Sequence, residues 1–155
     1  MTATRHESFR RLGTNRTILL VVTMMLGGRA MTLAFVGDVG SGGVGDPPAA
    51  WLMPLVGDAV IGVTALGVVF LIVWGRGLGA WTTIVVWNVV GIWDALSAFL
   101  LHQSVPWPEF FMIETFGSSM FFAASAMHLL NLWMVTRSEV RDHYLATQGV
   151  SGPTA

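Results

Sequence analysis

The sequence predicts an all-α integral membrane protein, a bundle of four transmembrane helices in up-down antiparallel order with both termini in the cytoplasm. Three observations lead to this prediction. Hydrophobic residues make up 54% of the chain and charged residues only 11%, whereas soluble domains carry roughly 25% charged residues. Four apolar stretches each approach or exceed the roughly 20 residues with which a helix crosses a bilayer. The arginines outside these stretches all fall on one side of the resulting topology.

The predicted spans form one domain, residues 18–135, which follows a basic N-terminal segment (1–17). They cover residues 18–36, 51–74, 81–101 and 110–135. The breaks between them contain turn-forming residues, such as Gly75-Arg76-Gly77 and Pro106-Trp107-Pro108. Because the connections are short, neighbouring helices should be antiparallel. The remaining residues, 136–155, become polar from His143 onward and are predicted to be a partly disordered cytoplasmic tail.

The arginines set the predicted orientation, because positive charge close to a span is retained on the cytoplasmic side. The predicted cytoplasmic side contains Arg5, Arg10, Arg11, Arg16, Arg76, Arg137 and Arg141. The opposite side contains acidic residues and His102 but no arginine. Trp51 and Trp107 fall at the outer boundary and Trp74 and Trp81 at the inner one, where amphipathic rings prefer to lie. We therefore expect a multi-pass protein of the plasma (inner) membrane.

Residue types that the chain lacks exclude several functions. It has no cysteine, which excludes disulfides, thiolate nucleophiles and iron–sulfur clusters. It has no lysine, which excludes Schiff-base chemistry and a P-loop. The net charge of -1 gives no reason to expect nucleic acid as a partner. Because His102 and His128 belong to opposite membrane faces, bis-histidine haem ligation is also disfavoured. We expect no cofactor and no metal.

Four ionisable side chains fall inside the predicted spans: Arg29, Asp58, Asp94 and Glu114. Each such residue costs at least about 2.5–3.5 kcal/mol at the bilayer centre, so it needs a partner, a wet cavity or a function. At 1.5 Å per residue, Asp94 lies about 20 Å above the inner boundary and Asp58 about 10 Å below the outer one, which is the same depth. Arg29 can extend outward to this level. We expect the arginine to bridge two carboxylates in the outer half of the membrane, with the third acid left without a cation.

A second polar pattern lies on the fourth span, where Glu114, Ser118, Ser125 and His128 share one helix face. Asn88, on the third span, falls near the level of His128 but is turned about 120° away from Asp94. We expect a neutral His128 bonded to Asn88, Ser125 or Asn131, with a proton-relay role as the alternative. About 21 Å separate His128 from Glu114 along the helix, which argues against one shared site and makes an enzyme less favoured than a non-catalytic role.

Three stretches carry a resemblance to a known group of proteins: Pro54–Leu66, with its Gly57-Asp58 pair; Trp87–Ala95, which reads Trp-Asn, Gly91 and Asp94; and Ala126–Leu130, which contains His128. Together they resemble a family of small, uncharacterised four-helix bacterial membrane proteins with GD...G.TAL and WN..G..D elements. The resemblance covers mainly the second to fourth helices. It implies the four-helix fold and singles out Asp58, Asn88, Asp94 and His128, whereas Arg29 and Glu114 are not part of the pattern.

The leading functional hypothesis is that the intramembrane cluster binds or passes a small ion or polar solute. Its ligand-binding residues would be Arg29, Asp58, Asn88, Asp94, Glu114, Ser118 and His128. One alternative is a purely structural ion-pair network that fixes helix register. Another is a non-catalytic assembly or interaction subunit of a larger membrane complex. The expected partners are the lipid bilayer and either a second copy or another membrane protein.

Overall fold

A computed structural model describes the backbone of residues 2–41, 50–105 and 117–146, with side chains from residue 10 onward. These residues form helices and no strand. Four helical segments are long and apolar enough to cross a membrane: Arg10–Gly40, Leu52–Trp74, Gly77–His102 and Ser119–Thr136. The prediction of an all-α protein with four candidate membrane spans is therefore confirmed. The start of the predicted fourth span, residues 110–116, lies outside the described residues.

The first span is longer than predicted and consists of three helices. It begins with α1 (Thr2–Gly27), continues through the 3-10 helix η1 (Gly28–Thr32) and ends with α2 (Leu33–Gly40). The tighter 3-10 helix begins at the second residue of the Gly27-Gly28 pair. Glycine restricts the backbone least, so a regular α-helix is less favoured at this point. Gly62 of α3 lies against this turn, and a Cβ there would overlap the backbone of Ala30. The close approach fixes η1, and with it Arg29, against α3.

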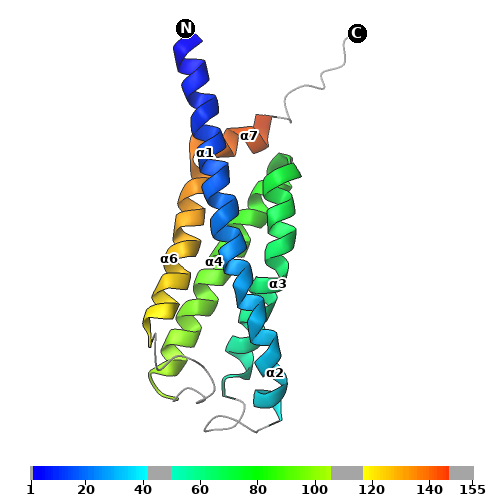
Figure 1. Ribbon diagram of the computed structural model, residues 1–155, viewed down its shortest axis with the longest axis vertical. Helices are drawn as coiled ribbons and strands as arrows, with labels where there is room; N and C mark the ends of the chain where they lie inside the picture. Colours follow the sequence, from blue (N-terminus) through cyan, green and yellow to red (C-terminus); the bar gives the residue numbers. More distant parts are fainter. Residues whose placement is uncertain (1, 42–49, 106–116, 147–155) are drawn as a thin grey trace.

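Each long helix has two long neighbours. Helix α1 packs against α3 (Leu52–Trp74) and α6 (Ser119–Thr136), and α4 (Gly77–His102) packs against the same two helices. Figure 1 shows the four side by side along the long axis, with the N-terminus and α7 at one end and α2 at the other.

Two apolar clusters fill the interior. One contains Leu19, Leu26, Ile61, Ile72, Ile84, Trp87 and Val135, and the other contains Val39, Trp51, Leu55, Ala98 and Phe121. Along each of the first three spans, an ionisable residue separates the two sets: Arg29 on η1, Asp58 on α3 and Asp94 on α4. The charged residues therefore occupy the level between the two apolar clusters.

The C-terminal region differs from the predicted tail, because residues Ser138–Leu145 form a helix, α7. Val140 and Tyr144 of this helix are completely buried. The Tyr144 hydroxyl donates to the carbonyls of Leu71 and Ile72, both at 3.3 Å, and Arg16 donates to that of Ile72 at 2.8 Å. Both carbonyls belong to the last turn of α3, where intrahelical N–H partners run out, and that of Leu71 also accepts from the N–H of Gly75 at 2.9 Å. Tyr144 and Arg16 thus cap α3. Helix α7 includes residues 143–145, the first residues of the segment that becomes polar in the predicted tail.

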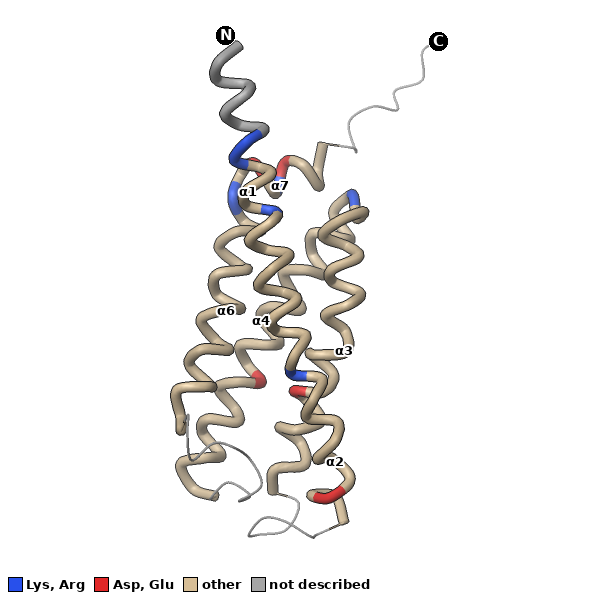
Figure 2. Tube along the Cα trace, in the orientation of Figure 1, with Lys and Arg blue, Asp and Glu red and all other residues tan. Residues whose placement is uncertain are grey.

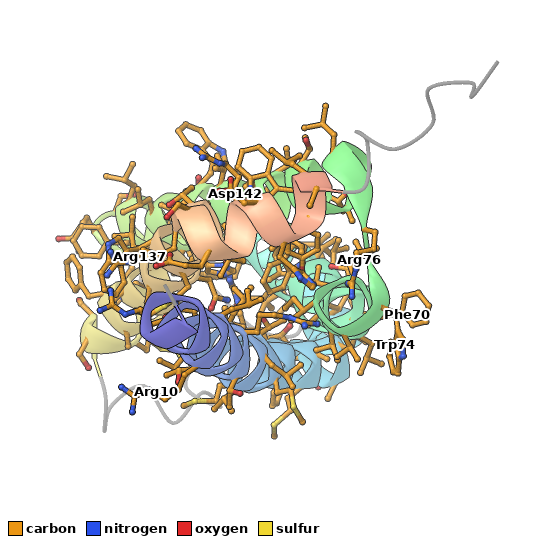
Figure 3. The ribbon with its side chains drawn as sticks, turned by 90° about the horizontal axis from the view of Figure 1, so that it is seen from above. Arg10, Phe70, Trp74, Arg76, Arg137 and Asp142 are labelled. Atoms are coloured by element: carbon orange, nitrogen blue, oxygen red, sulfur yellow. The ribbon has the colours of Figure 1, made fainter. Side chains whose placement is uncertain are left out.

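The described charges are unevenly distributed. Figure 2 shows the basic positions gathered at the end of the molecule that carries α7, apart from one position midway along the helices that lies beside acidic ones. Figure 3 looks onto that end and shows α7 lying across it, with Arg76 close to its C-terminal turn. Phe70 and Trp74 project outward from α3 in the same view, and both side chains are exposed. The α7 end is therefore the basic end of the protein.

Candidate functional site

Arg29 is the centre of the candidate site. Its Nε donates to Asp58 Oδ1 at 2.5 Å, and its Nη2 forms ion pairs with the carboxylates of both Asp58 and Asp94. Its Nη1 lies 3.1 Å from Nε2 of His128. All three guanidinium nitrogens therefore have partners, and one side chain in η1 joins α3, α4 and α6. We call Arg29, Asp58, Asp94, His128 and Asn88 the polar cluster.

The hydrogen bonds of Asn88 define the state of His128. The Asn88 amide Nδ2 donates to the carbonyl of Ile84 at 2.9 Å, so its Oδ1 is the acceptor that faces His128 Nδ1 at 3.0 Å. The proton of the imidazole must then be on Nδ1, and the lone pair of Nε2 accepts from Arg29. Both ring nitrogens are satisfied in the neutral form. The completely buried His128 ring therefore contributes no charge to the site.

The charges of the polar cluster do not balance. Among the described residues, Arg29 is the cation in every ion pair that Asp58 and Asp94 form. Two carboxylates therefore share one guanidinium, and His128 is neutral. The side chains are only 13% (Arg29), 24% (Asp58) and 15% (Asp94) exposed. Because an uncompensated charge is costly in such surroundings, one further positive charge would stabilise the site.

Two glycines lack the side-chain atoms that would otherwise overlap members of the polar cluster. A Cβ at Gly57 of α3 would overlap the carboxylate of Asp94, and a Cβ at Gly91 of α4 would overlap the imidazole of His128. Both belong to helix interiors, where glycine is destabilising relative to alanine by roughly 0.5–1 kcal/mol. The close approach of Asp94 and His128 therefore explains why these two helix positions are glycine.

Trp87 holds the other side of the histidine ring. Its indole Nε1 donates to Thr64 Oγ1 on α3 at 3.0 Å. The two rings of Trp87 and His128 have centroids 5.1 Å apart and planes at 61°, an edge-to-face arrangement. With Gly91 on the adjacent turn, this contact restricts His128 to the orientation in which Nε2 meets Arg29.

The two carboxylates border different spaces. Asp58, with Arg29 and Thr32, lines a cavity of about 460 Å³ whose other wall is α6, from Ser119 to Met127. Asp94, with Ser97, lines a space of about 360 Å³ between α3 and α4. A small ligand therefore has two possible approaches to the cluster, one on each side of Arg29.

The structure brings together Arg29, Asp58, Asp94, Asn88 and His128 of the predicted site residues. Ser118 lies outside this group, at the N-cap of α6, where its side chain forms no capping hydrogen bond. Glu114 lies outside the described residues. Ser125 is buried, and its hydroxyl has no hydrogen-bond partner among the described residues.

His128 shares a partner with Asp58 and Asp94, although the argument from its distance to Glu114 had placed it apart from the acids. His128 lies within hydrogen-bond distance of the same arginine that binds both aspartates. The sequence estimate counted residues along the fourth span from His128 to Glu114. It therefore compared backbone positions and took no account of side-chain length. The long side chain of Arg29 connects the histidine to the aspartates.

The partners of Gly57 and Gly91 were not predicted from the sequence. A signal was present in the sequence, since Gly57 directly precedes Asp58 and Gly91 lies between Asn88 and Asp94. No family model, no curated protein and no solved structure matches the chain.

Proposed function

We propose that the protein binds a small monovalent cation, with a proton as the simplest case, at the polar cluster within the membrane. The observation that carries this proposal is the sharing of one guanidinium by Asp58 and Asp94. A bound monovalent cation would bring the charge of the cluster to zero. Arg29 holds both carboxylates in place and gives up neither contact on binding, so the cation adds to an existing arrangement.

The membrane topology that accompanies this function is an up-down antiparallel bundle with both termini in the cytoplasm. It is supported by the basic end of the protein, since positive charge next to spans is retained on the cytoplasmic side. The link of two residues, Gly75 and Arg76, between α3 and α4 also supports antiparallel neighbours. In the plasma membrane, Asp58 and Asp94 would then lie in the outer half.

Protons and other cations must compete for the cluster, because both neutralise the same carboxylates. Binding of a metal cation or a small amine should therefore release a proton whenever the site is already protonated, and should strengthen as the pH rises. A purely structural ion-pair network predicts neither effect. The competition can be measured on the unmodified protein.

The test is isothermal titration calorimetry of the full chain in phosphatidylcholine nanodiscs, with sodium and methylammonium chloride as separate titrants at constant ionic strength. Titrations in two buffers with different ionisation enthalpies report the protons released. We expect Asp58→Asn and Asp94→Asn each to weaken binding by about tenfold or more, which corresponds to the loss of one charge contact. Asp38→Asn is the matched control, because Asp38 is exposed on α2 and contacts no member of the cluster.

Two results would contradict the proposal. One is an unmodified protein that binds neither cation at any pH at which it stays folded. The other is a folded Asp94→Asn variant that binds as the unmodified protein does. If binding is absent and Asp94→Asn also loses its folded yield, the cluster serves only to hold the helices together, as expected of a non-catalytic assembly subunit.

A further inference from the structure

A long groove follows the outer surface of the α3–α4 pair. Its volume is about 1060 Å³, and its walls include Val60, Val68, Leu71, Leu78, Val86 and Val90. Val60, Ile61 and Val90 also line the smaller space that reaches Asp94 and Ser97. The two spaces therefore adjoin each other on the α3–α4 pair, and their lining residues extend from the α3–α4 link to a carboxylate of the polar cluster.

The groove offers an apolar surface along most of its length. Two of its three threonine hydroxyls are internally bonded, since Thr64 donates to the carbonyl of Val60 at 2.6 Å and Thr83 donates to that of Gly79 at 2.9 Å. Gly67 on α3 and Gly79 on α4 line the groove, and a Cβ at either position would meet no atom within 4 Å. The open space at these glycines suits an apolar chain that needs no hydrogen bonds.

The end of the groove near Asp94 has the opposite chemistry. The Ser97 hydroxyl already donates to the carbonyl of Trp93 at 2.8 Å, so its oxygen can only accept a further hydrogen bond. Asp94 is a carboxylate of a cluster that carries excess negative charge. This end therefore favours a positively charged group that donates hydrogen bonds. It disfavours phosphate and carboxylate groups, because they would add negative charge to the cluster.

We infer that the α3–α4 groove binds an amphipathic ammonium compound, with its alkyl chain along the groove and its ammonium group at Asp94 and Ser97. The inference rests on the proposed function and names the class of cation that the site accepts. Between Val90 and Leu78 the groove follows α4 for about 18 Å, at 1.5 Å per residue, which accommodates a long alkyl chain. The alkyl chain of the ligand makes apolar contacts along the groove, and the polar cluster selects a positively charged head group.

The experiment compares two probes with the same head group, dodecylammonium and methylammonium, on the full chain in phosphatidylcholine nanodiscs. Dodecanoate has the same chain with the opposite charge and tests the role of the head group. Empty nanodiscs measure partitioning into the lipid, which is subtracted. We expect dodecylammonium to bind about tenfold more tightly than methylammonium, through its added apolar contacts, and we expect no specific binding of dodecanoate.

The groove is tested with the double variant Gly67→Leu/Gly79→Leu, whose new side chains fill the groove without touching the polar cluster. It should bind methylammonium as the unmodified protein does and should lose the advantage of dodecylammonium. Gly67→Ala/Gly79→Ala, with much smaller side chains, is the matched control and should keep most of that advantage. Asp94→Asn should weaken the binding of both probes.

The outcomes separate this inference from the proposed function. If dodecylammonium binds equally well to the leucine double variant and to the unmodified protein, the groove is not its site and the inference is overturned. Equal affinities of the two probes for the unmodified protein would also overturn it, as expected if ordinary lipid chains already fill the groove. In both cases methylammonium binding that depends on Asp94 would leave the cation site intact, whereas loss of that dependence would end the proposed function itself.

Discussion

Gly91 and His128 lie so close across the α4–α6 contact that a methyl group at position 91 would overlap the imidazole ring. The same ring receives a hydrogen bond from Arg29 and donates one to Asn88. The position of the α4 backbone therefore determines whether the histidine can take part in the polar cluster.

Gly91→Ala should displace His128 and break its two hydrogen bonds. We expect the free energy of unfolding to fall by about 1–3 kcal/mol, as is usual when a well-packed interior is overfilled. Thermal unfolding in detergent measures the change, and the fluorescence of Trp87 reports the movement of the adjacent ring. Gly67→Ala is the control, because its Cβ meets open space. A Gly91→Ala variant as stable as this control would show that the contact is loose.

Arg29→Met should be among the most damaging single substitutions. It leaves Asp58 and Asp94 buried without a cation, for which a loss of about 3–5 kcal/mol in stability is expected. The triple variant Arg29→Met/Asp58→Asn/Asp94→Asn should recover much of this loss, because no charge is then left unpaired. The unfolding midpoints of the unmodified protein, Arg29→Met and the triple variant measure the loss and its recovery. A triple variant no more stable than Arg29→Met would rule out charge imbalance as the cause.

The docking of α7 should weaken in acid through His143. Burial, followed by the positive charges of Arg76 and Arg16, lowers the pKa of His143 from its usual 6.5. The docked state thus binds its proton less readily than the undocked state, so docking is most stable above pH 6.5 and weakens as the pH falls through and below that value. Hydrogen exchange of residues 138–145 between about pH 8 and pH 5 measures this effect.

His143→Gln is the matched variant for the acid effect, since glutamine cannot gain a charge. Its α7 amides should exchange at a rate that, after correction for intrinsic chemistry, does not depend on pH. If the unmodified protein shows the same profile as the glutamine variant, the histidine does not control docking.

Tyr144→Phe should loosen the C-terminal end of α3 with little effect on the packing of α7. The hydroxyl donates to the carbonyls of Leu71 and Ile72, and its removal should cost about 0.5–1.5 kcal/mol. Tyr144→Ala removes the buried ring as well and should cost considerably more. Chemical unfolding of both variants in detergent separates the two contributions. Equal losses in the two variants would assign the whole effect to the hydroxyl.

The spans and the level of the acids could be predicted from the sequence, because both follow from helix rise. Counting residues gave Asp58 and Asp94 the same depth, and in the structure both carboxylates contact Arg29. The place of His128 could not be predicted in this way, because it depends on the length and direction of the arginine side chain. Residue spacing defines backbone levels, whereas the reach of a long side chain depends on neighbouring helices.

Helix α7 was missed for a different reason. Its composition is polar, and only Val140 and Tyr144, four residues apart, show that one face is buried. Such a short pattern occurs often in disordered segments. It predicts a buried helix face only when the surface that it packs against is known. Here that surface includes the last turn of α3, which comes from a distant part of the sequence.

The three-way attachment of Arg29 has a consequence for how the chain enters the bilayer. During synthesis the first span emerges before α3, α4 and α6, which carry the partners of its guanidinium. The nearest carboxylate arrives with α3, the second with α4, and the imidazole only with α6. The first span should therefore insert poorly alone and become firmly seated only when the later helices join it, so that Asp58 and Asp94 govern the biogenesis of a segment that precedes them.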